Sequence, residues 1–430
     1  TLVMLLALLP ATALAADENK CGENATWELS GNTLTISGTG AMADYASGGA
    51  QPWASSKTAI TKVVIEKGIT RIGDRAFMGF SSLTSVTIPE SVTAYGTNAF
   101  HSCTSLTELQ VGKNVDSIGQ IGVYLDTAMA ALDVSPENTK YASVDNWLYE
   151  LNSDGTAYLW QVPAGAIKDL TEITVPSTIT WNGRAYTVIG VGKASSDSYT
   201  LAGAAAVTHV ELPASVTEVG ANAFHRCNEL AEINLAGITA FGTAALANTK
   251  LTAVTLNDGL TALAESLFNG CSMLTSITCG ENITLIGKNA LGRCDALKSI
   301  SVRSKTMTLG GAAFNADKAL EVLDLSSVTA LTLDTGENNR LPLAINRSGA
   351  VVAACYVASA TQQQQLSNQF TTNTVYFGVT NGGTFQNSTF AQGTLAEPFK
   401  AGYKFEGWHE AEDCSDAVFT GTPAAGHTYY

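Results

Sequence analysis

Apolar and polar positions repeat along the chain with a period of about 23 residues between Ile65 and Leu325. Each unit begins with a Leu and continues with two apolar residues that flank one polar residue. It later contains an aliphatic-Gly pair and an Ala-Phe pair. The second apolar position of successive units is held by Ile65, Ile88, Val111, Val134, Val175, Leu212, Leu235, Leu256, Cys279, Val302 and Leu325. A fixed period of this length predicts a solenoid, in which each unit buries its apolar face only against its neighbours.

The alternation inside each unit predicts a short strand. In the unit Leu83–Pro89, Val86 and Ile88 are expected to point inward and Thr87 outward, which is the period-two pattern of a strand with one buried face. Later units keep the same offsets, so the equivalent strands should stack in parallel. Ten or more strands at about 4.8 Å spacing would form a sheet on the order of 50 Å long.

Glycines recur where the chain must bend between buried positions. We expect these glycines to adopt a positive φ and to leave no room for a larger residue. They are Gly73, Gly96, Gly119, Gly220, Gly242 and Gly287.

Two insertions interrupt the period around Val175, and both have the pattern of a β-hairpin. The first, near 141–163, contains an Asp-Gly turn, and the second, near 179–190, contains an Asn-Gly turn. Two roles are open for their aromatic residues, which either pack against the coils beneath or stack on a ligand. These residues are Trp147, Trp160, Trp181 and Tyr186.

The repeat units resemble a known family. The segments Ile88–Leu109 and Leu212–Ile233 are similar to the BspA-like leucine-rich repeats found on surface proteins of gut and oral bacteria and some protozoa. The resemblance covers roughly residues 60–325. The preceding segment Trp27–Gly40 resembles the hairpin that opens many members and would cover the apolar end of the first coil. The resemblance therefore implies a leucine-rich-repeat solenoid with a stacked parallel β-sheet and an N-terminal β-hairpin cap.

A different composition begins near Val375. The segments Asn381–Phe385, Gly393–Phe399 and Ala401–His409 resemble the Listeria-Bacteroides repeat, a small β-grasp module that acts as a spacer or presentation unit in bacterial surface proteins. The segment stops before the usual closing strand of that module, so we expect a truncated copy. The expected domains are a partial signal peptide (1–15), an N-terminal cap (16–59), the solenoid (60–345), a C-terminal cap or linker (346–374) and the module (375–430).

The N-terminus predicts export. Thr1–Ala15 is an apolar run that ends in small residues, and polar residues follow it at once, as in a signal peptide and its cleavage site. No later stretch is apolar for long enough to span a bilayer, so membrane insertion is not expected. The formal charge of −15, from 38 acidic and 23 basic residues, disfavours nucleic acid and anionic membranes as partners. We therefore expect an extracellular protein, secreted or held at the cell surface.

Four of the eight cysteines occupy one repeat position, three residues after the end of the Ala-Phe pair. A shared repeat position favours a column of buried thiols with a packing role. Cys271 and Cys294 lie in adjacent coils, and the sequence leaves open whether they form a disulfide. No Cys-x-x-Cys pair or His cluster is present, so no metal is expected. The four residues are Cys103, Cys227, Cys271 and Cys294.

No motif for catalysis or for a cofactor is present. The chain contains no Gly-x-Ser-x-Gly, no phosphate-binding Gly-x-x-x-x-Gly-Lys and no His-Glu-x-x-His. His101 and His225 share a repeat position but are 124 residues apart, so they cannot meet in a solenoid, and we expect both to be exposed turn residues. The sequence therefore predicts a protein that is not an enzyme.

The outward positions of the strands form columns that consist mostly of short polar residues. The one concentration of charge places Glu172, Glu211 and Glu232 around His209. This cluster either serves solubility or binds a ligand. The family resemblance favours an adhesin-like monomer that binds a host or neighbouring-cell protein or glycan. The alternative is a non-catalytic spacer that holds another domain away from the cell wall.

Overall fold

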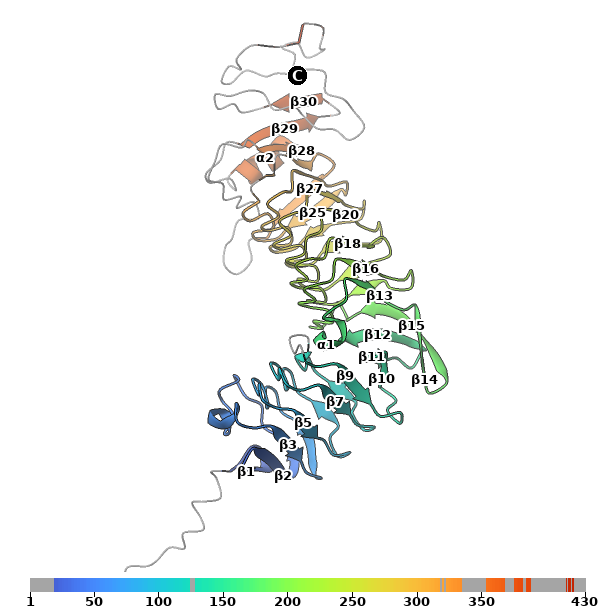
Figure 1. Cartoon of the computed structure of the whole chain (residues 1–430). Helices are drawn as coiled ribbons and strands as arrows, with labels where there is room; N and C mark the ends of the chain where they lie inside the picture. Colours follow the sequence, from blue (N-terminus) through green and yellow to red (C-terminus); the bar gives the residue numbers. More distant parts are fainter. Residues whose placement is uncertain are drawn as a thin grey trace, which may run out of the picture. The chain divides into compact units, whose positions relative to one another are not determined.

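A computed structural model describes residues 19–123, 128–317, 319–320, 322–334, 353–367, 375–381, 384–387, 415, 417–418 and 420. The chain divides into two compact units, each of which is described by itself. The first unit comprises residues 1–168 and 179–186, and the second comprises residues 169–178 and 187–430. Within each unit, short strands of successive coils lie above one another like rungs (Figure 1).

The first unit opens with an antiparallel hairpin of β1 (Asn24–Ser30) and β2 (Thr33–Ala41). The start of β2 then pairs in parallel with the first coil, and its end pairs with a second parallel sheet. On one side of the coils, β3 (Lys62–Ile65) pairs in parallel with β5 (Ser85–Thr87), and β7 (Glu108–Val111) pairs in parallel with β9 (Ala131–Val134) in a separate two-stranded sheet. The row on the other side is formed by β4 (Ile69–Ile72), β6 (Ala94–Tyr95) and β8 (Ser117–Ile118). A 3-10 turn, η1 (Ala54–Ser56), lies between β2 and β3.

Two antiparallel elements interrupt the repeat. Strands β10 (Tyr141–Val144), β11 (Trp147–Leu151) and β12 (Thr156–Gln161) form a meander, and the one-turn helix α1 (Ala164–Ile167) follows it. Strand β14 (Thr178–Trp181) then pairs with β15 (Arg184–Val191). The turn between them has positive φ at Asn182 and at Gly183, which are the angles of a tight hairpin turn.

The second unit continues the parallel stacking. One row contains β13 (Glu172–Thr174), β16 (His209–Glu211), β18 (Glu232–Ile233), β20 (Ala253–Thr255), β22 (Ser276–Thr278), β24 (Ser299–Ser301), β26 (Val322–Leu325) and β28 (Ala353–Val357). The second row contains β17 (Glu218–Val219), β19 (Ala240–Phe241), β21 (Ala262–Leu263), β23 (Leu285–Ile286), β25 (Thr306–Leu309) and β27 (Ala330–Leu333). The prediction of a solenoid with stacked parallel strands is therefore confirmed.

Strand registry reproduces the sequence period. Lys62 pairs with Ser85, and Ser276 pairs with Ser299, in each case 23 residues later. Most inward residues of the strands are buried, whereas Val86, Ile88 and Ile233 are half-buried. The Phe of the Ala-Phe pair forms a second buried column, in which the ring of Phe77 stacks on Phe100 at 5.4 Å between centroids and on Trp53 at 6.0 Å. In the first unit, the strand side chains and these rings therefore form one continuous core.

The repeat glycines behave differently from the prediction. None of the six expected residues has a positive φ. As expected, there is no space for a side chain at these positions. A Cβ on Gly96, for example, would lie 2.5 Å from the backbone nitrogen of Asp74 in the preceding coil. Positive φ occurs instead two residues after five of these glycines, at Arg75, Asn98, Asn222, Ala244 and Asn289. The coil-to-coil distance, rather than the backbone conformation, requires glycine at these positions.

Replacing Gly96 with Ala is expected to lower the free energy of unfolding by about 2 to 3 kcal/mol, because the added methyl must push two coils apart. Guanidinium unfolding followed by tryptophan fluorescence would measure the loss. Gly49→Ala is the matched control, since no atom lies within 4 Å of a Cβ there. Equal stability of the two variants would contradict the close approach at Gly96.

At the C-terminal side, helix α2 (Ala360–Ser367) packs against the end of the repeat. The buried side chain of Gln362 donates a hydrogen bond to the carbonyl oxygen of Val328 (2.7 Å) and accepts one from the amide of Ala358 (2.9 Å). Strands β29 (Val375–Asn381) and β30 (Thr384–Asn387) extend the sheet beyond β28. Most of the predicted β-grasp module and all of the predicted signal peptide lie outside the described residues.

Candidate functional site

Three neighbouring strands bring together residues that are far apart in the sequence. In the parallel registry of β13, β16 and β18, Glu172 is opposite His209, and His209 is opposite Glu232. The following residues of β13 and β16, Ile173 and Val210, are buried. Because side chains alternate along a strand, burial of these residues directs His209 and its two neighbours outward. The strands therefore hold an imidazole between two carboxyl groups on the solvent face.

We call Glu172, His209, Glu211 and Glu232 the acidic patch. The Nδ1 atom of His209 lies 3.3 Å from Oε2 of Glu232, and its Nε2 atom lies 3.8 Å from Oε2 of Glu211. The side chains are 38% exposed at His209, 53% at Glu211 and 78% at Glu232. Ion pairs in such solvent-exposed positions contribute only about 0 to 1 kcal/mol to stability. These side chains can therefore turn toward a ligand at little cost.

The patch surrounds an open hollow of about 410 Å³. Its lining residues are Glu172, Thr208, His209, Ala231 and Glu232. Thr208 and Ala231 are small and directly precede β16 and β18, so they leave space between the longer acidic side chains. The arrangement can accept hydrogen bonds from a ligand and attract positive charge. Strand registry made this cluster predictable, whereas the hollow depends on packing and was not foreseen.

The aromatic residues of the two hairpins belong to the first unit and are largely packed. Trp160 and Tyr186 are each only 8% exposed, and Trp147 and Trp181 are half-buried. The indole N–H of Trp181 donates to the carbonyl oxygen of Asn138 (3.3 Å). Burial of more than nine-tenths of Trp160 and of Tyr186 favours the packing role for these two residues.

The cysteine column has the packing role that its repeat position suggests. Each of the four thiols is buried and donates to the carbonyl oxygen of a residue in the preceding coil, at Sγ to O distances between 3.1 and 3.3 Å. None of the cysteines in the described part of the chain forms a disulfide. Burial raises the pKa of the Cys227 thiol to about 12, so this thiol is protonated and unreactive at neutral pH.

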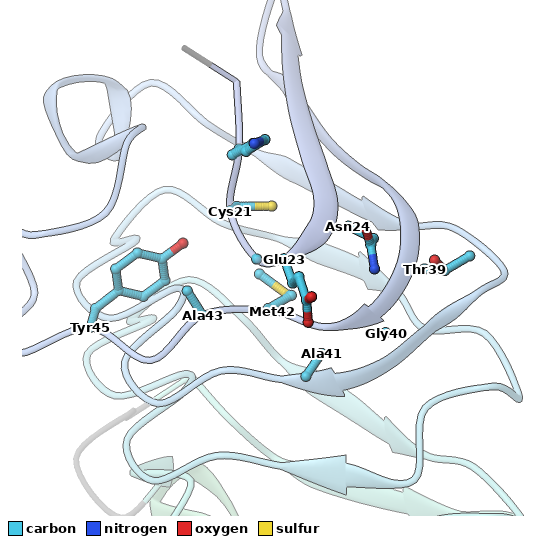
Figure 2. A pocket seen from close by; sticks show the side chains of 11 residues that line it. Cys21, Glu23, Asn24, Thr39, Gly40, Ala41, Met42, Ala43 and Tyr45 are labelled. Carbon is cyan, nitrogen blue, oxygen red and sulfur yellow. The ribbon is translucent and has the colours of Figure 1, made fainter. Parts of the chain in front are cut away.

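A second hollow, of about 460 Å³, lies beside the end of β2 (Figure 2). Cys21, Met42 and Tyr45 are among its lining residues. Burial raises the pKa of Cys21 to about 12 and also raises that of Tyr45, so both groups are neutral at physiological pH. No residue type in the sequence pointed to this hollow. Its protonated thiol and phenol supply neither a nucleophile nor a base.

The two repeat histidines are less accessible than expected. His101 and His225 are half-buried rather than exposed, and this burial lowers the pKa of each imidazole. Within the described ranges, no three His, Cys, Asp or Glu side chains are grouped so that they could hold a metal ion. Of the helices that the structure describes, none is both long and apolar enough to cross a membrane.

One known structure shows the same type of fold with a TM-score above 0.5, and two others have lower scores. A leucine-rich repeat protein from Eubacterium ventriosum is 24% identical over 76% of this chain and 95% of its own, with a TM-score of 0.52. The pneumococcal vaccine antigen PcpA is 17% identical over 82% of this chain and 97% of its own, with a TM-score of 0.45. A leucine rich cell surface protein from Faecalibacterium prausnitzii is 16% identical over 76% and 98% of the two chains, with a TM-score of 0.28. No curated protein matches the chain.

A family model gives the more specific result. The model of the BspA type leucine rich repeat region matches six copies, in residues 54–142 and 195–321, which together make up just over half of the chain. These ranges contain most of the strands of both parallel rows. The region between them contains the two antiparallel hairpins, which depart from the repeat. The chain therefore belongs to the family of BspA type leucine-rich repeat proteins.

Proposed function

We propose that this protein is a non-catalytic adhesin-like binding protein, which holds a protein or glycan partner on the outward face of its leucine-rich repeat sheet. The observation that carries the proposal is the acidic patch, where three strands present an imidazole and three carboxyl groups, and the imidazole and two of these carboxyl groups line an open hollow. Side chains on stacked parallel strands keep their spacing without the partner. Such preorganisation lowers the entropy lost on binding.

The architecture favours binding over catalysis. Successive coils of a solenoid form an extended surface, and proteins with this architecture use it for binding. The carboxyl groups of the patch lie on one open face, whereas glycoside hydrolysis requires two carboxyl groups on either side of a bond. A monomer that presents this face to its surroundings is sufficient for the proposed role.

An extracellular location, secreted or at the cell surface, is part of the proposal. It is supported by the apolar N-terminal segment Thr1–Ala15 with its small-residue end, which has the pattern of a signal peptide. The excess of acidic residues is consistent with a partner other than nucleic acid.

The double variant Glu211→Ala, Glu232→Ala tests the proposal. Binding of the purified protein to whole cells is expected to fall at least tenfold, because two of the three carboxyl groups are removed. The melting temperature is expected to stay within about 2 °C, since substitutions at exposed positions change stability by roughly 0.5 kcal/mol or less. Flow cytometry with labelled protein and a thermal melt provide the two measurements.

Glu265→Ala, Glu281→Ala is the matched control, because it removes the same charge from exposed positions away from the patch. This control should bind cells like the unchanged protein. Undiminished cell binding by the patch variant would contradict the proposal and would favour the spacer function.

A further inference from the structure

We infer that the acidic patch docks a polypeptide segment that carries basic side chains and runs across the strands in an extended conformation. The inference rests on the proposed function and specifies the chemistry of its partner. It is carried by the uncompensated charge of the patch, by the spacing of its carboxyl groups and by the shape of the hollow between them.

The charge of the patch is negative in every protonation state of His209. Its three carboxylates face one imidazole, so the net charge is −2 with a protonated ring and −3 with a neutral ring. Strands β13, β16 and β18 contain no Lys or Arg. On the neighbouring coil, Lys250 already pairs with Glu229 (Nζ to Oε2, 2.6 Å). A partner with positive charge would therefore neutralise carboxylates that have no Lys or Arg on their own strands.

Glu172 is the most available group in the patch. Its side chain is exposed, and it has no hydrogen-bond or ion-pair partner among the residues that the structure describes. By contrast, Glu232 lies beside Nδ1 of His209, and Glu211 accepts a hydrogen bond from the side-chain amide of Asn234 (3.3 Å). A cation at Glu172 therefore displaces no existing contact of the protein.

The spacing of the strands that carry Glu172 and Glu232 matches an extended chain. Glu172 and Glu232 are two strands apart in one column, which corresponds to about 10 Å. In a polyproline II helix, residues three apart point to the same side and are separated by about 9 Å. A segment with a basic residue at every third position can therefore place one cation at Glu172 and the next at Glu232.

The hollow suits the stems of basic side chains. It is bordered by Thr208 and Ala231, which present a methyl group each and leave about 410 Å³ open between the acidic side chains. Lys and Arg side chains cover apolar surface with their methylene groups while the charged head reaches an acceptor. Neutral sugars, in contrast, gain from the large flat rings of Trp, Tyr and Phe, and these three strands carry none of these residues.

A peptide of three Pro-Pro-Arg repeats is the probe, because its basic residues recur at the required interval on one side of the helix. Fluorescence anisotropy with a labelled peptide is expected to show binding to the whole protein. The dissociation constant should rise at least tenfold in Glu172→Gln, Glu232→Gln. It should also rise when NaCl increases from about 50 to about 300 mM, since salt screens exposed charges. A peptide of three Pro-Pro-Glu repeats should not bind.

The control variant Glu265→Gln, Glu281→Gln has the same net charge as the patch variant, and it should bind the probe like the unchanged protein. Equal affinity of the patch variant and the control would overturn the inference, because the attraction would then arise from overall charge. Circular dichroism melts of both variants establish that they are folded, and Gln preserves the shape of Glu.

Two other outcomes separate this inference from the proposed function. If the probe does not bind while cell binding still depends on Glu211 and Glu232, the inference is wrong and the proposed function stands. If a chitosan hexamer binds through the patch and the peptide does not, the partner is an amino glycan, which also overturns the inference. Probe binding without any patch-dependent cell binding would instead contradict the proposed function.

Discussion

Replacing Phe100 with Ala is expected to lower the free energy of unfolding by about 3 to 5 kcal/mol, because it opens a cavity in the ring column. The side chain is fully buried, stacks on Phe77 and contacts Tyr95 edge to face at 6.5 Å between centroids. Backbone hydrogen bonds join this turn to both adjacent coils, including one from the amide of Phe100 to the carbonyl oxygen of Ile121 (3.2 Å). The coils therefore cannot close the cavity without breaking these bonds.

Guanidinium unfolding followed by tryptophan fluorescence measures this loss in the first unit, where Trp53 belongs to the same column. Phe100→Leu, which keeps most of the volume, should cost less than about 1.5 kcal/mol. The equivalent change Phe224→Ala should produce a loss of similar size in the second unit. A loss below about 1 kcal/mol for Phe100→Ala would show that the ring is not part of the core.

The change Asn138→Ala is expected to cost about 4 kcal/mol, although it removes only a small polar side chain. Asn138 is 1% exposed, and its amide nitrogen donates to the carbonyl oxygens of Gly112 (2.8 Å) and Val115 (2.9 Å). Its amide oxygen accepts from the backbone N–H groups of Lys140 and Tyr141, both at 2.8 Å. Alanine would leave four backbone groups without this partner, and each buried unsatisfied group costs about 1 to 3 kcal/mol.

Guanidinium unfolding again provides the measurement, and Asn114→Ala is the matched control. The side chain of Asn114 also donates to a carbonyl oxygen of the preceding coil, that of Glu90 (2.8 Å), but in an exposed position where water can replace it. The control should therefore lose less than about 1 kcal/mol. Similar losses in the two variants would mean that Asn138 does not hold the first hairpin insertion to the repeat.

Much of the fold could be predicted because a solenoid is nearly one-dimensional. Each coil contacts mainly the next one, so a residue and the residue about 23 positions later usually lie side by side on adjacent coils. This relation alone predicts that Phe100 and Phe224 lie in the core and that Cys103 and Cys227 lie in a buried column, and all four are buried. It also identified His209 as the neighbour of Glu232.

Features that depend on distances between coils were predicted less well. Gly96 was expected to have a positive φ, but the residue with a positive φ is Asn98. Glycine is required at position 96 because the backbone of Asp74 approaches too closely for a side chain. The hydrogen bonds of Asn138 join residues of the hairpin insertion to an earlier coil. The insertion is not part of the repeat, so the repeat period does not predict these bonds. His101 shares a turn position with His225 in the sequence, but only packing reveals that both are half-buried.

The sequence by itself determined that the chain is a stack of parallel coils and which residues share a column, including Glu172, His209 and Glu232. It could do so because the repeat pattern remains recognisable on both sides of the insertions, and because inward and outward positions alternate along each strand. Only the tertiary structure decided that Trp160 and Tyr186 are packed and that an open hollow lies among the acidic side chains. Burial and surface shape depend on side-chain volumes from several coils together, and no single repeat contains that information.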